Sequence, residues 1–392
     1  MAQETGVKNT GLRGVKVADT KISFIDGNKG ILLYRGYSIE ELASNSTYLE
    51  TAYLILNDRL PSQAELKDFK EKIAIYSILP DYIANSMKTW PKDTLPMQAM
   101  ITALSMLGFS DKTIDNKNLE EHQERAVRLI AQLPVLVAAW HRIRKGHEPL
   151  LFDPSISFAE NFLYQVTGEK PDTEIAKKLD VCLILHAEHT FNASTFACRE
   201  VVSTQSDMYS GTVAGIAALS GPLHGGANEV VMAMLLELEN EPDVEGWVRN
   251  RIQQGQRIMG MGHAVYKTRD PRAFILKEMC RTLGEKLGQL KWFQLLERIE
   301  KAALQEFETR GKTGIQPNID FFSAPVYHMF GLPTDLFTPV FAISRMAGWC
   351  AHMLEEKFAL AQPKPTLYRP SAEYIGNYCG LLGCGYKPVN ER

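Results

Sequence analysis

Three glycine-containing loops of the 392-residue sequence hold the side chains best suited to chemistry. The first, residues 220–228, reads Ser-Gly-Pro-Leu-His-Gly-Gly-Ala-Asn and places His224 among glycines between two predicted helices. Glycine weakens a helix but lets the backbone approach a ligand closely. Histidine is the side chain whose charge is tuned most easily near neutral pH. The pattern favours a ligand site at His224, and the alternative is a tight turn with an incidental histidine.

The second loop, residues 258–272, reads Ile-Met-Gly-Met-Gly-His-Ala-Val-Tyr-Lys-Thr-Arg-Asp-Pro-Arg. It combines His263 with the cations Lys267, Arg269 and Arg272 ahead of a helix predicted to start near Pro271. Backbone N–H groups, an imidazole, cations and a helix N-terminus together favour an anionic ligand. The Gly-x-Gly is not a dinucleotide fingerprint, because no strand precedes it and the third glycine is missing. The alternative is a solvated basic turn.

The third loop, residues 317–325, reads Pro-Asn-Ile-Asp-Phe-Phe-Ser-Ala-Pro and opens an apolar helix. Its Asp320 stands beside Phe321 and Phe322, so we expect the carboxylate to be partly desolvated. Burial raises the pKa of a carboxyl group and makes it a stronger base, which suits removal of a proton from carbon. The alternative is a helix cap in the first turn.

Four further residues are candidates for binding a ligand. His186 and His189 lie three apart on a predicted helix and could share a face. They do not form a His-Glu-x-x-His pair and have no third ligand at a recognisable spacing, so we predict no metal site. Arg345 interrupts an otherwise apolar helix, which favours either a bound carboxylate or a structural salt bridge. Arg369 follows in a Tyr-Arg-Pro segment.

The elements that must position these residues are nearly all helical. Two short runs, 21–26 and 31–35, are separated by Gly-Asn-Lys-Gly and predict a small N-terminal β-hairpin. Ser62 and Glu65 form a capping box before a helix over 66–79. A long helix over 119–145 contains Pro134, which should bend it. Further predicted helices cover 172–189, 193–203, 207–220, 227–239, 244–256, 271–287, 292–309, 319–330 and 334–358. We therefore predict an all-α fold, and no fixed repeat indicates a solenoid.

Composition narrows the partners and the compartment. With 392 residues, of which 45% are hydrophobic and 23% charged, the chain has the composition of an ordinary globular protein and a length that suits about two domains. Its net charge of -3 provides no surplus of cations for binding nucleic acid or an anionic membrane. Six scattered cysteines indicate neither a zinc site nor a disulfide framework, so we expect reduced thiols. Residues 1–20 lack an apolar signal segment, and the apolar run 133–140 is shorter than a membrane span. We expect a cytoplasmic protein.

Five motifs, taken together and in this order, closely resemble the citrate synthase family, specifically its short bacterial and archaeal type. They are His-Ala-Glu-His, Gly-Pro-Leu-His-Gly-Gly-Ala-Asn, Gly-His-Ala-Val-Tyr-Lys-x-x-Asp-Pro-Arg, Pro-Asn-Ile-Asp-Phe and Ser-Arg-Met-Ala-Gly-Trp-x-Ala-His. The resemblance runs from about residue 21 to residue 376. It implies a large helical domain over 1–221 and 326–392, and a smaller helical domain over 222–325 that closes over the active site.

The resemblance also implies a reaction and a role for each candidate. Asp320 would remove a methyl proton from acetyl-CoA, His224 would stabilise the enol or enolate, and His263 would polarise the ketone of oxaloacetate. The citryl-CoA formed would then be hydrolysed to citrate and CoA. The residues that match the family's oxaloacetate ligands are His189, Arg272, Arg345 and Arg369, the last supplied by the neighbouring subunit of a homodimer. The candidates for binding CoA phosphates are Lys267, Arg269 and Lys312.

Several alternatives stay open at this point. Ala264 stands where many relatives carry arginine, which leaves the phosphate contacts undecided. A 2-methylcitrate synthase would use propionyl-CoA with the same catalytic residues, and one methylene is worth only about 1–3 kcal/mol in a pocket. Acetyl-CoA is favoured by analogy alone. A non-enzymatic helical scaffold and a metal-dependent acyl hydrolase built on His186 and His189 are the remaining readings. We expect no metal and no resident cofactor, with the CoA thioester as a substrate.

Overall fold

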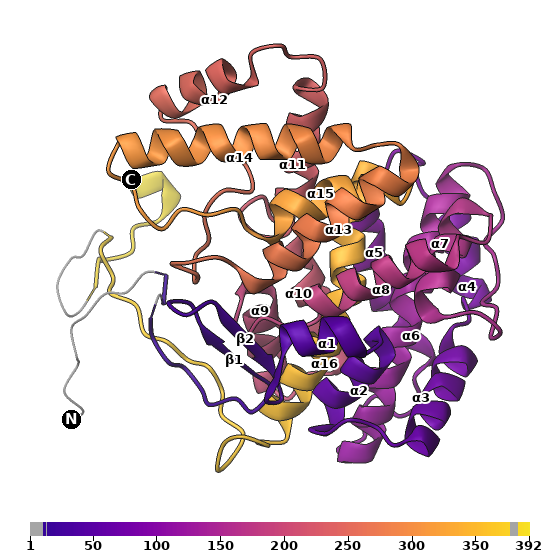
Figure 1. Cartoon of the computed structure of the whole chain (residues 1–392). Coiled ribbons are helices and arrows are strands. Elements are labelled where there is room, and N and C mark those ends of the chain that lie inside the picture. The colour runs from indigo at the N-terminus through magenta and orange to yellow at the C-terminus, as the bar shows by residue number, and fades with distance from the viewer. Residues whose placement is uncertain (1–10, 13, 377–382) are drawn as a thin grey trace.

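The computed structural model describes residues 11–12, 14–376 and 383–392 (Figure 1). The described part contains sixteen α-helices, three short 3-10 helices and one small antiparallel sheet. The predicted all-α fold is therefore confirmed. The small sheet lies at one side of the helical body, next to α1 (Figure 1).

The sheet has three strands where the sequence predicted two. Strands β1 (Ser23–Asp26) and β2 (Ile31–Tyr34) form the expected hairpin, with Phe24 opposite Leu33. A third strand, β3 (Tyr37–Ser38), pairs with β2 and is only two residues long, too short to leave a pattern in the sequence. Tyr34 is fully buried and its hydroxyl donates to the backbone carbonyl of Glu188 at 2.9 Å. The sheet thereby contacts the segment that carries His189.

The first eight helices include the three that the sequence predicted over 66–79, 119–145 and 172–189, and five that it did not predict. Their bounds are α1 (Ile39–Asn45), α2 (Tyr48–Asn57), α3 (Gln63–Tyr76), α4 (Asp81–Thr89), α5 (Pro96–Leu107), α6 (Leu119–Arg144), α7 (Phe158–Thr167) and α8 (Thr173–His186). The capping box of Ser62 and Glu65 is present and starts α3 at the next residue. Helix α8 ends at His186, three residues before the predicted end. The prediction that His186 and His189 share a helix face is therefore wrong.

The other eight helices complete the chain. They are α9 (Ala193–Ser203), α10 (Met208–Leu219), α11 (Ala227–Glu237), α12 (Val244–Gln253), α13 (Pro271–Leu287), α14 (Lys291–Thr309), α15 (Ile319–Met329) and α16 (Phe337–Lys357). The three 3-10 helices are η1 (Gly108–Ser110), η2 (Thr334–Leu336) and η3 (Val389–Glu391). The predicted helix over 334–358 thus begins with the 3-10 turn η2 before α16.

Two long helices form the centre of the core. Every residue of α16 is buried, and this helix packs against α6, α8, α9 and α10. Helix α6 passes through Pro134 without being divided, and Pro134 itself is buried. By length and composition α6 could cross a membrane, but 83% of its most apolar stretch is buried inside the protein. Helix α6 is therefore best explained as a core helix.

Helices α11 to α15 correspond to the predicted small domain over 222–325. Helix α12 packs on α14, and α13 packs on α15; α11, α12 and α14 lie together at the top of the molecule (Figure 1). The predicted boundary at residue 325 falls inside α15. The division into two domains, and the closure of one over the other, stay predictions.

The cysteines of the described part differ in state. Cys182, Cys198, Cys280 and Cys350 are free and buried, as expected for structural thiols. Cys384 is disulfide-bonded, so the prediction of uniformly reduced thiols is wrong for this residue. The scattered spacing of the cysteines carried no signal for this bond.

Candidate active site

His224 lies in the turn between α10 and α11 and is held in one protonation state. Its Nε2 accepts the backbone N–H of Ser194 at 3.2 Å, and the Ser194 hydroxyl lies 2.8 Å from the same atom. A backbone N–H can only donate, so Nε2 carries no proton and Nδ1 carries it. Burial, followed by the positive charge of Arg345, lowers the pKa of His224 to about 4. At neutral pH the ring is uncharged and has one N–H left to donate.

The N-terminus of α9 holds Ser194 in place. Asn192 caps this helix by accepting the backbone N–H of Thr195 at 3.1 Å, and its Oδ1 lies 2.8 Å from the Ser194 hydroxyl. This hydroxyl has one proton, which it can donate either to Oδ1 of Asn192 or to Nε2 of His224. The indole N–H of Trp349 donates to the Ser194 hydroxyl at 3.2 Å. Ser194 is fully buried. The sequence analysis did not identify this serine, because its contact with His224 joins residues thirty positions apart.

His263 is held in the other neutral tautomer, with its proton on Nε2 and not on Nδ1. Its Nδ1 accepts the backbone N–H groups of Val265 at 2.9 Å and Tyr266 at 3.2 Å. The proton of the neutral ring therefore sits on Nε2. Burial, followed by the charge of Arg272, lowers the pKa of His263 to about 4. His263, like His224, is a neutral imidazole with a single free donor.

The loop of His263 is bonded directly to the segment that precedes Asp320. The backbone N–H of Asn318 donates to the carbonyl of Gly260 at 2.9 Å, and the Asn318 amide donates to the carbonyl of Gly262 at 2.8 Å. Gly260 has a φ of +79°, and a β-carbon at this position would lie 2.8 Å from that of Phe321. A side chain at Gly260 would separate the two loops. The glycine in the motif thus serves close packing.

Asp320 is the second residue of α15 and does not cap the helix. Asn318 is the cap, and its side chain accepts the backbone N–H of Asp320 at 3.0 Å. The carboxylate of Asp320 accepts no hydrogen bond from the described part of the chain. Burial raises its pKa to about 6, against the opposing charges of Arg272 and Arg345. The side chain is a partly buried, unpaired carboxylate of increased basicity.

Two buried arginines supply positive charge to the same region. Arg272 makes a bidentate pair with Asp270, with N–O distances of 3.0 and 2.8 Å. Burial alone would lower the pKa of Arg272, but the Asp270 carboxylate raises it above its ordinary value. Arg345 donates from Nε to the carbonyl of His186 at 2.7 Å, and burial lowers its pKa to about 10. Both guanidinium groups stay charged at neutral pH.

His189 lies between these groups, in the turn after α8. Its ring is 5.4 Å from the ring of His263, and its Nε2 is 3.4 Å from the hydroxyl of Tyr266. Burial, followed by the charge of Arg272, lowers its pKa well below the ordinary value. His186 instead contacts the carbonyl of Cys182 at 2.9 Å from Nδ1. In the described ranges no three potential metal ligands gather into a group.

The charges of the two arginines act on four of the predicted residues, which are His189, His224, His263 and Asp320. The charge of Arg345 acts on His224 and Asp320, and that of Arg272 acts on His263 and Asp320. The ring of Phe341 lies near both His224 and Arg345, with its centroid 6.4 Å from that of the His224 ring and 4.8 Å from the guanidinium carbon of Arg345. The arrangement can bind a small dianion, donate two neutral hydrogen bonds and remove a proton. It combines the base, the hydrogen-bond donors and the cations that are required to form a carbanion next to a bound electrophile.

The candidate CoA ligands are only partly grouped. A cavity of about 410 Å³ beside His263 is lined by Lys312 and also by Arg257. Lys267 and Arg269 are exposed and do not line this cavity, and Arg269 lies over the ring of Phe274. The sequence analysis missed Arg257, although it directly precedes the 258–272 motif.

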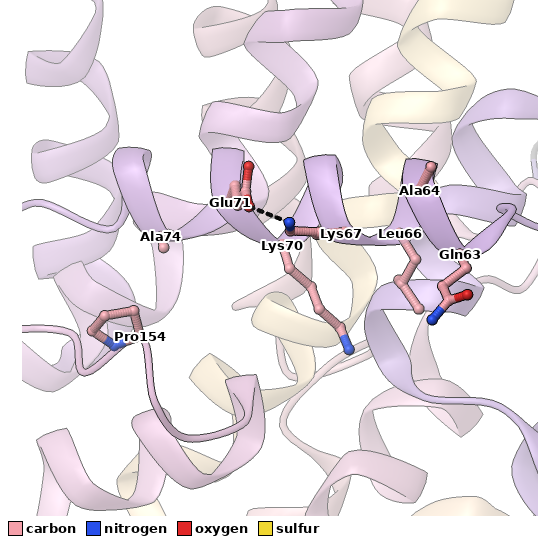
Figure 2. Close-up of a pocket in the computed structure, with 8 residues that line it drawn as sticks. All are labelled: Gln63, Ala64, Leu66, Lys67, Lys70, Glu71, Ala74 and Pro154. Carbon is pink, nitrogen blue, oxygen red and sulfur yellow. Dashed lines mark ion pairs between the residues drawn. The ribbon is translucent and has the colours of Figure 1, made fainter.

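Arg369 and the larger surface hollows lie outside this arrangement. Arg369 is exposed, and its guanidinium donates to the carbonyl of Pro370 at 3.3 Å. A broad hollow of about 730 Å³ runs along α3 and includes the ion pair of Lys67 and Glu71 (Figure 2). It contains none of the predicted site residues. Neither Arg369 nor this hollow is part of the cluster around Arg272 and Arg345.

A carbanion formed beside a tightly held dicarboxylate is the chemistry of condensing acyltransferases. Sequence comparison agrees, since the model of the citrate synthase C-terminal domain matches residues 11–371. The chain belongs to the citrate synthase family, whose members make citrate from acetyl-CoA and oxaloacetate. Family membership sets aside the helical scaffold and the metal-dependent acyl hydrolase.

Individual relatives extend the match over the whole chain. A citrate synthase of Synechocystis is 41% identical over 100% of this chain and 96% of its own length. A citrate/2-methylcitrate synthase of Bacillus subtilis is 38% identical over 93% of this chain and 96% of its own length. The citrate synthase of Thermoplasma acidophilum was solved as a ternary complex with carboxymethyl coenzyme A and oxaloacetate. Its structure superposes on this one with a TM-score of 0.89 at 35% sequence identity, and the match covers 97% of this chain and 98% of that chain.

Proposed function

We propose that the protein condenses acetyl-CoA with oxaloacetate and hydrolyses the resulting citryl-CoA to citrate and CoA, using Asp320, His224 and His263. The observation that carries these roles is the state of the three groups. Asp320 is an unpaired carboxylate with its pKa raised to about 6, and both imidazoles are neutral with one oriented donor each. A base and two donors of this kind fit an enolisation followed by addition to a ketone.

Asp320 and His224 act on acetyl-CoA. A thioester methyl group is a very weak acid, so its proton leaves only if the charge that develops on the carbonyl oxygen is stabilised at the same time. Asp320 takes the proton, and the Nδ1–H of His224 donates to the oxygen. One such donor contributes about 10²–10³ in rate, or about 2.7–4 kcal/mol. Because the Ser194 N–H holds Nε2 of His224, the donor needs no rearrangement as the charge forms.

His263 and the arginines act on oxaloacetate. The Nε2–H of His263 polarises the ketone and donates to the alkoxide that forms from it. Arg272 and Arg345 bind the two carboxylates, an interaction that is strong because both partners are charged and largely removed from water. His189 adds a further hydrogen bond. Lys312 and Arg257, which line the cavity beside His263, bind the CoA phosphates in this proposal. No resident cofactor or metal takes part in these steps.

The protein acts as a cytoplasmic homodimer in this proposal, with Arg369 reaching the active site of the neighbouring subunit. The exposed position of Arg369 supports this role, as does its bond to the backbone carbonyl of Pro370, which leaves the positive charge of the guanidinium available to a ligand. Helix α10, which is apolar on most of its faces, carries the exposed small residues Ser210 and Ala217, and Phe109 beside it is 78% exposed. Such a surface suits close packing against a second copy.

The proposal is tested by mixing the purified protein with oxaloacetate and either acetyl-CoA or propionyl-CoA. CoA release is followed with a thiol reagent, and kcat/KM is determined for each thioester. We expect release with both thioesters and a higher kcat/KM for acetyl-CoA. Absence of CoA release would refute the function. A higher kcat/KM for propionyl-CoA would instead identify a 2-methylcitrate synthase, an activity that the name of the Bacillus subtilis relative includes.

A further inference from the structure

The turn that carries His189 is held by the side chain of its neighbour, Glu188. Glu188 is fully buried, and its Oε1 accepts the backbone N–H of Thr190 at 2.5 Å and the hydroxyl of Ser23 at 2.8 Å. Thr190 has a φ of +51°, a conformation that costs energy for a β-branched residue. The Glu188 carboxylate therefore stabilises a strained turn and, with it, the position of His189.

A third donor to the same oxygen is His352 of α16. Its Nε2 lies 3.0 Å from Oε1 of Glu188, and its Nδ1 lies 3.0 Å from Nη1 of Arg199. A guanidinium only donates, so Nδ1 is the acceptor and Nε2 carries the proton. His352 is fully buried and is thus locked as a bridge between a cation and an anion.

Glu188 is also the opposite charge that acts most strongly on Arg345. Its negative charge opposes the lowering of the Arg345 pKa by burial. The turn packs directly on α16, because a β-carbon at Gly348 would lie 2.4 Å from Oε2 of Glu188. A shift of the Glu188 carboxylate would therefore move His189 and change the surroundings of Arg345 together.

We propose that His352 is a positioning residue of the oxaloacetate pocket, which holds the Glu188 carboxylate so that the turn of His189 and the charge beside Arg345 are fixed. This inference rests on the proposed function, because it takes His189 and Arg345 as oxaloacetate ligands. His352 does not touch the substrate. It acts through Glu188 and should affect binding of oxaloacetate more than the chemical steps.

The same chain of contacts reaches the segment that carries Arg369. Arg199 pairs with Glu356 at 2.6 Å as well as with His352, and the hydroxyl of Tyr368 donates to Glu356 at 2.7 Å. Tyr368 directly precedes Arg369. A single buried polar network thus runs from the His189 turn of a subunit to the segment proposed to serve its neighbour.

Two amide substitutions of similar size separate positioning from general packing. His352→Asn keeps an acceptor near the Nδ1 position, facing Arg199, but is too short to donate to Glu188. His352→Gln reaches the Nε2 position and can donate to Glu188. We expect His352→Asn to raise the KM for oxaloacetate about tenfold or more, with the KM for acetyl-CoA and kcat changed less than threefold. His352→Gln should restore most of the loss.

Met353→Ala is the matched control, since Met353 is equally buried on α16 but faces Gly211 of α10. It should lower the melting temperature without raising the KM for oxaloacetate. Equal KM values in His352→Asn and wild type, or an equal rise in Met353→Ala, would overturn the proposal. If neither His352 variant folds, Glu188→Gln makes the same prediction for oxaloacetate.

Calorimetric titration of oxaloacetate into the wild type and the variants separates this proposal from the function. If wild type releases no CoA but binds oxaloacetate, the proposed function fails while the affinity ratio of His352→Asn to His352→Gln still tests positioning. If wild type releases CoA and the two variants bind oxaloacetate equally well, positioning fails alone. Absence of oxaloacetate binding by the wild type would refute both.

Discussion

Replacing the proposed base with a neutral isostere should make the protein more stable. Burial raises the pKa of Asp320 from an ordinary 3.8 to about 6, which means that the folded protein resists ionisation of this group. A difference of roughly two pKa units corresponds to about 3 kcal/mol at 1.36 kcal/mol per unit. Above pH 6 that free energy opposes folding. Asp320→Asn removes it, so we expect an increase in the free energy of unfolding of up to about 3 kcal/mol at pH 8.

The sign of the pH dependence makes this test specific. Between pH 3.8 and about 6 the folded protein binds more protons at Asp320 than the unfolded chain does, so stability falls as pH rises through this window. The advantage of Asp320→Asn should therefore be small below pH 3.8, where both states are protonated, and full at pH 8. Melting curves of both proteins at several pH values measure it. A variant that is less stable than wild type at pH 8, or an advantage independent of pH, would refute the assignment of a desolvated, unpaired carboxylate.

Three further predictions follow from the same geometry. The pH profile of kcat/KM should fall about tenfold per unit below pH 6, where Asp320 becomes protonated; a profile flat to pH 5 would exclude this base. Gly260→Ala should lower both activity and melting temperature, because its β-carbon would lie 2.8 Å from that of Phe321. Gly288→Ala, with a φ of +65° and open space around the position, carries only the backbone strain, so equal losses in the two variants would contradict the packing argument. Arg369→Ala should raise the KM for oxaloacetate. Mixing this variant with Asp320→Asn should restore activity, because each mixed dimer has one site with both an intact Asp320 and an Arg369 from the neighbouring subunit. If activity is not restored, Arg369 acts in the active site of the subunit that carries it.

Local signals in the sequence account for most of the fold. Ser62 and Glu65 predicted the start of α3 because a capping box depends on residues only three apart. The end of α8 was missed because Ala-Glu-His-Thr contains no helix-breaking residue. The helix stops where the Tyr34 hydroxyl bonds the backbone of Glu188 and the Glu188 carboxylate bonds Thr190, contacts made by tertiary structure.

In the candidate site, too, local features could be predicted from the sequence, whereas contacts made by tertiary structure could not. Glycines and unusual polar residues marked His224, His263 and Asp320, because a loop that interrupts a helical pattern is visible in sequence. Their protonation states were not visible. They depend on Ser194 and on backbone N–H groups after His263, which the fold brings to the rings. His352 ends one of the five motifs, but its contacts with Glu188 and Arg199 could likewise not be predicted from the sequence.

The most direct test of the central claim is the exchange of acetyl-CoA methyl hydrogens with deuterated solvent. The protein is incubated with acetyl-CoA and a dicarboxylate analogue of oxaloacetate that cannot accept the carbanion, and exchange is followed by mass spectrometry. We expect Asp320→Asn to lower the exchange rate by roughly 10²–10⁴-fold while its affinity for oxaloacetate stays close to that of wild type. Exchange at the wild-type rate in this variant would contradict the account, because the proton would then be removed by another group.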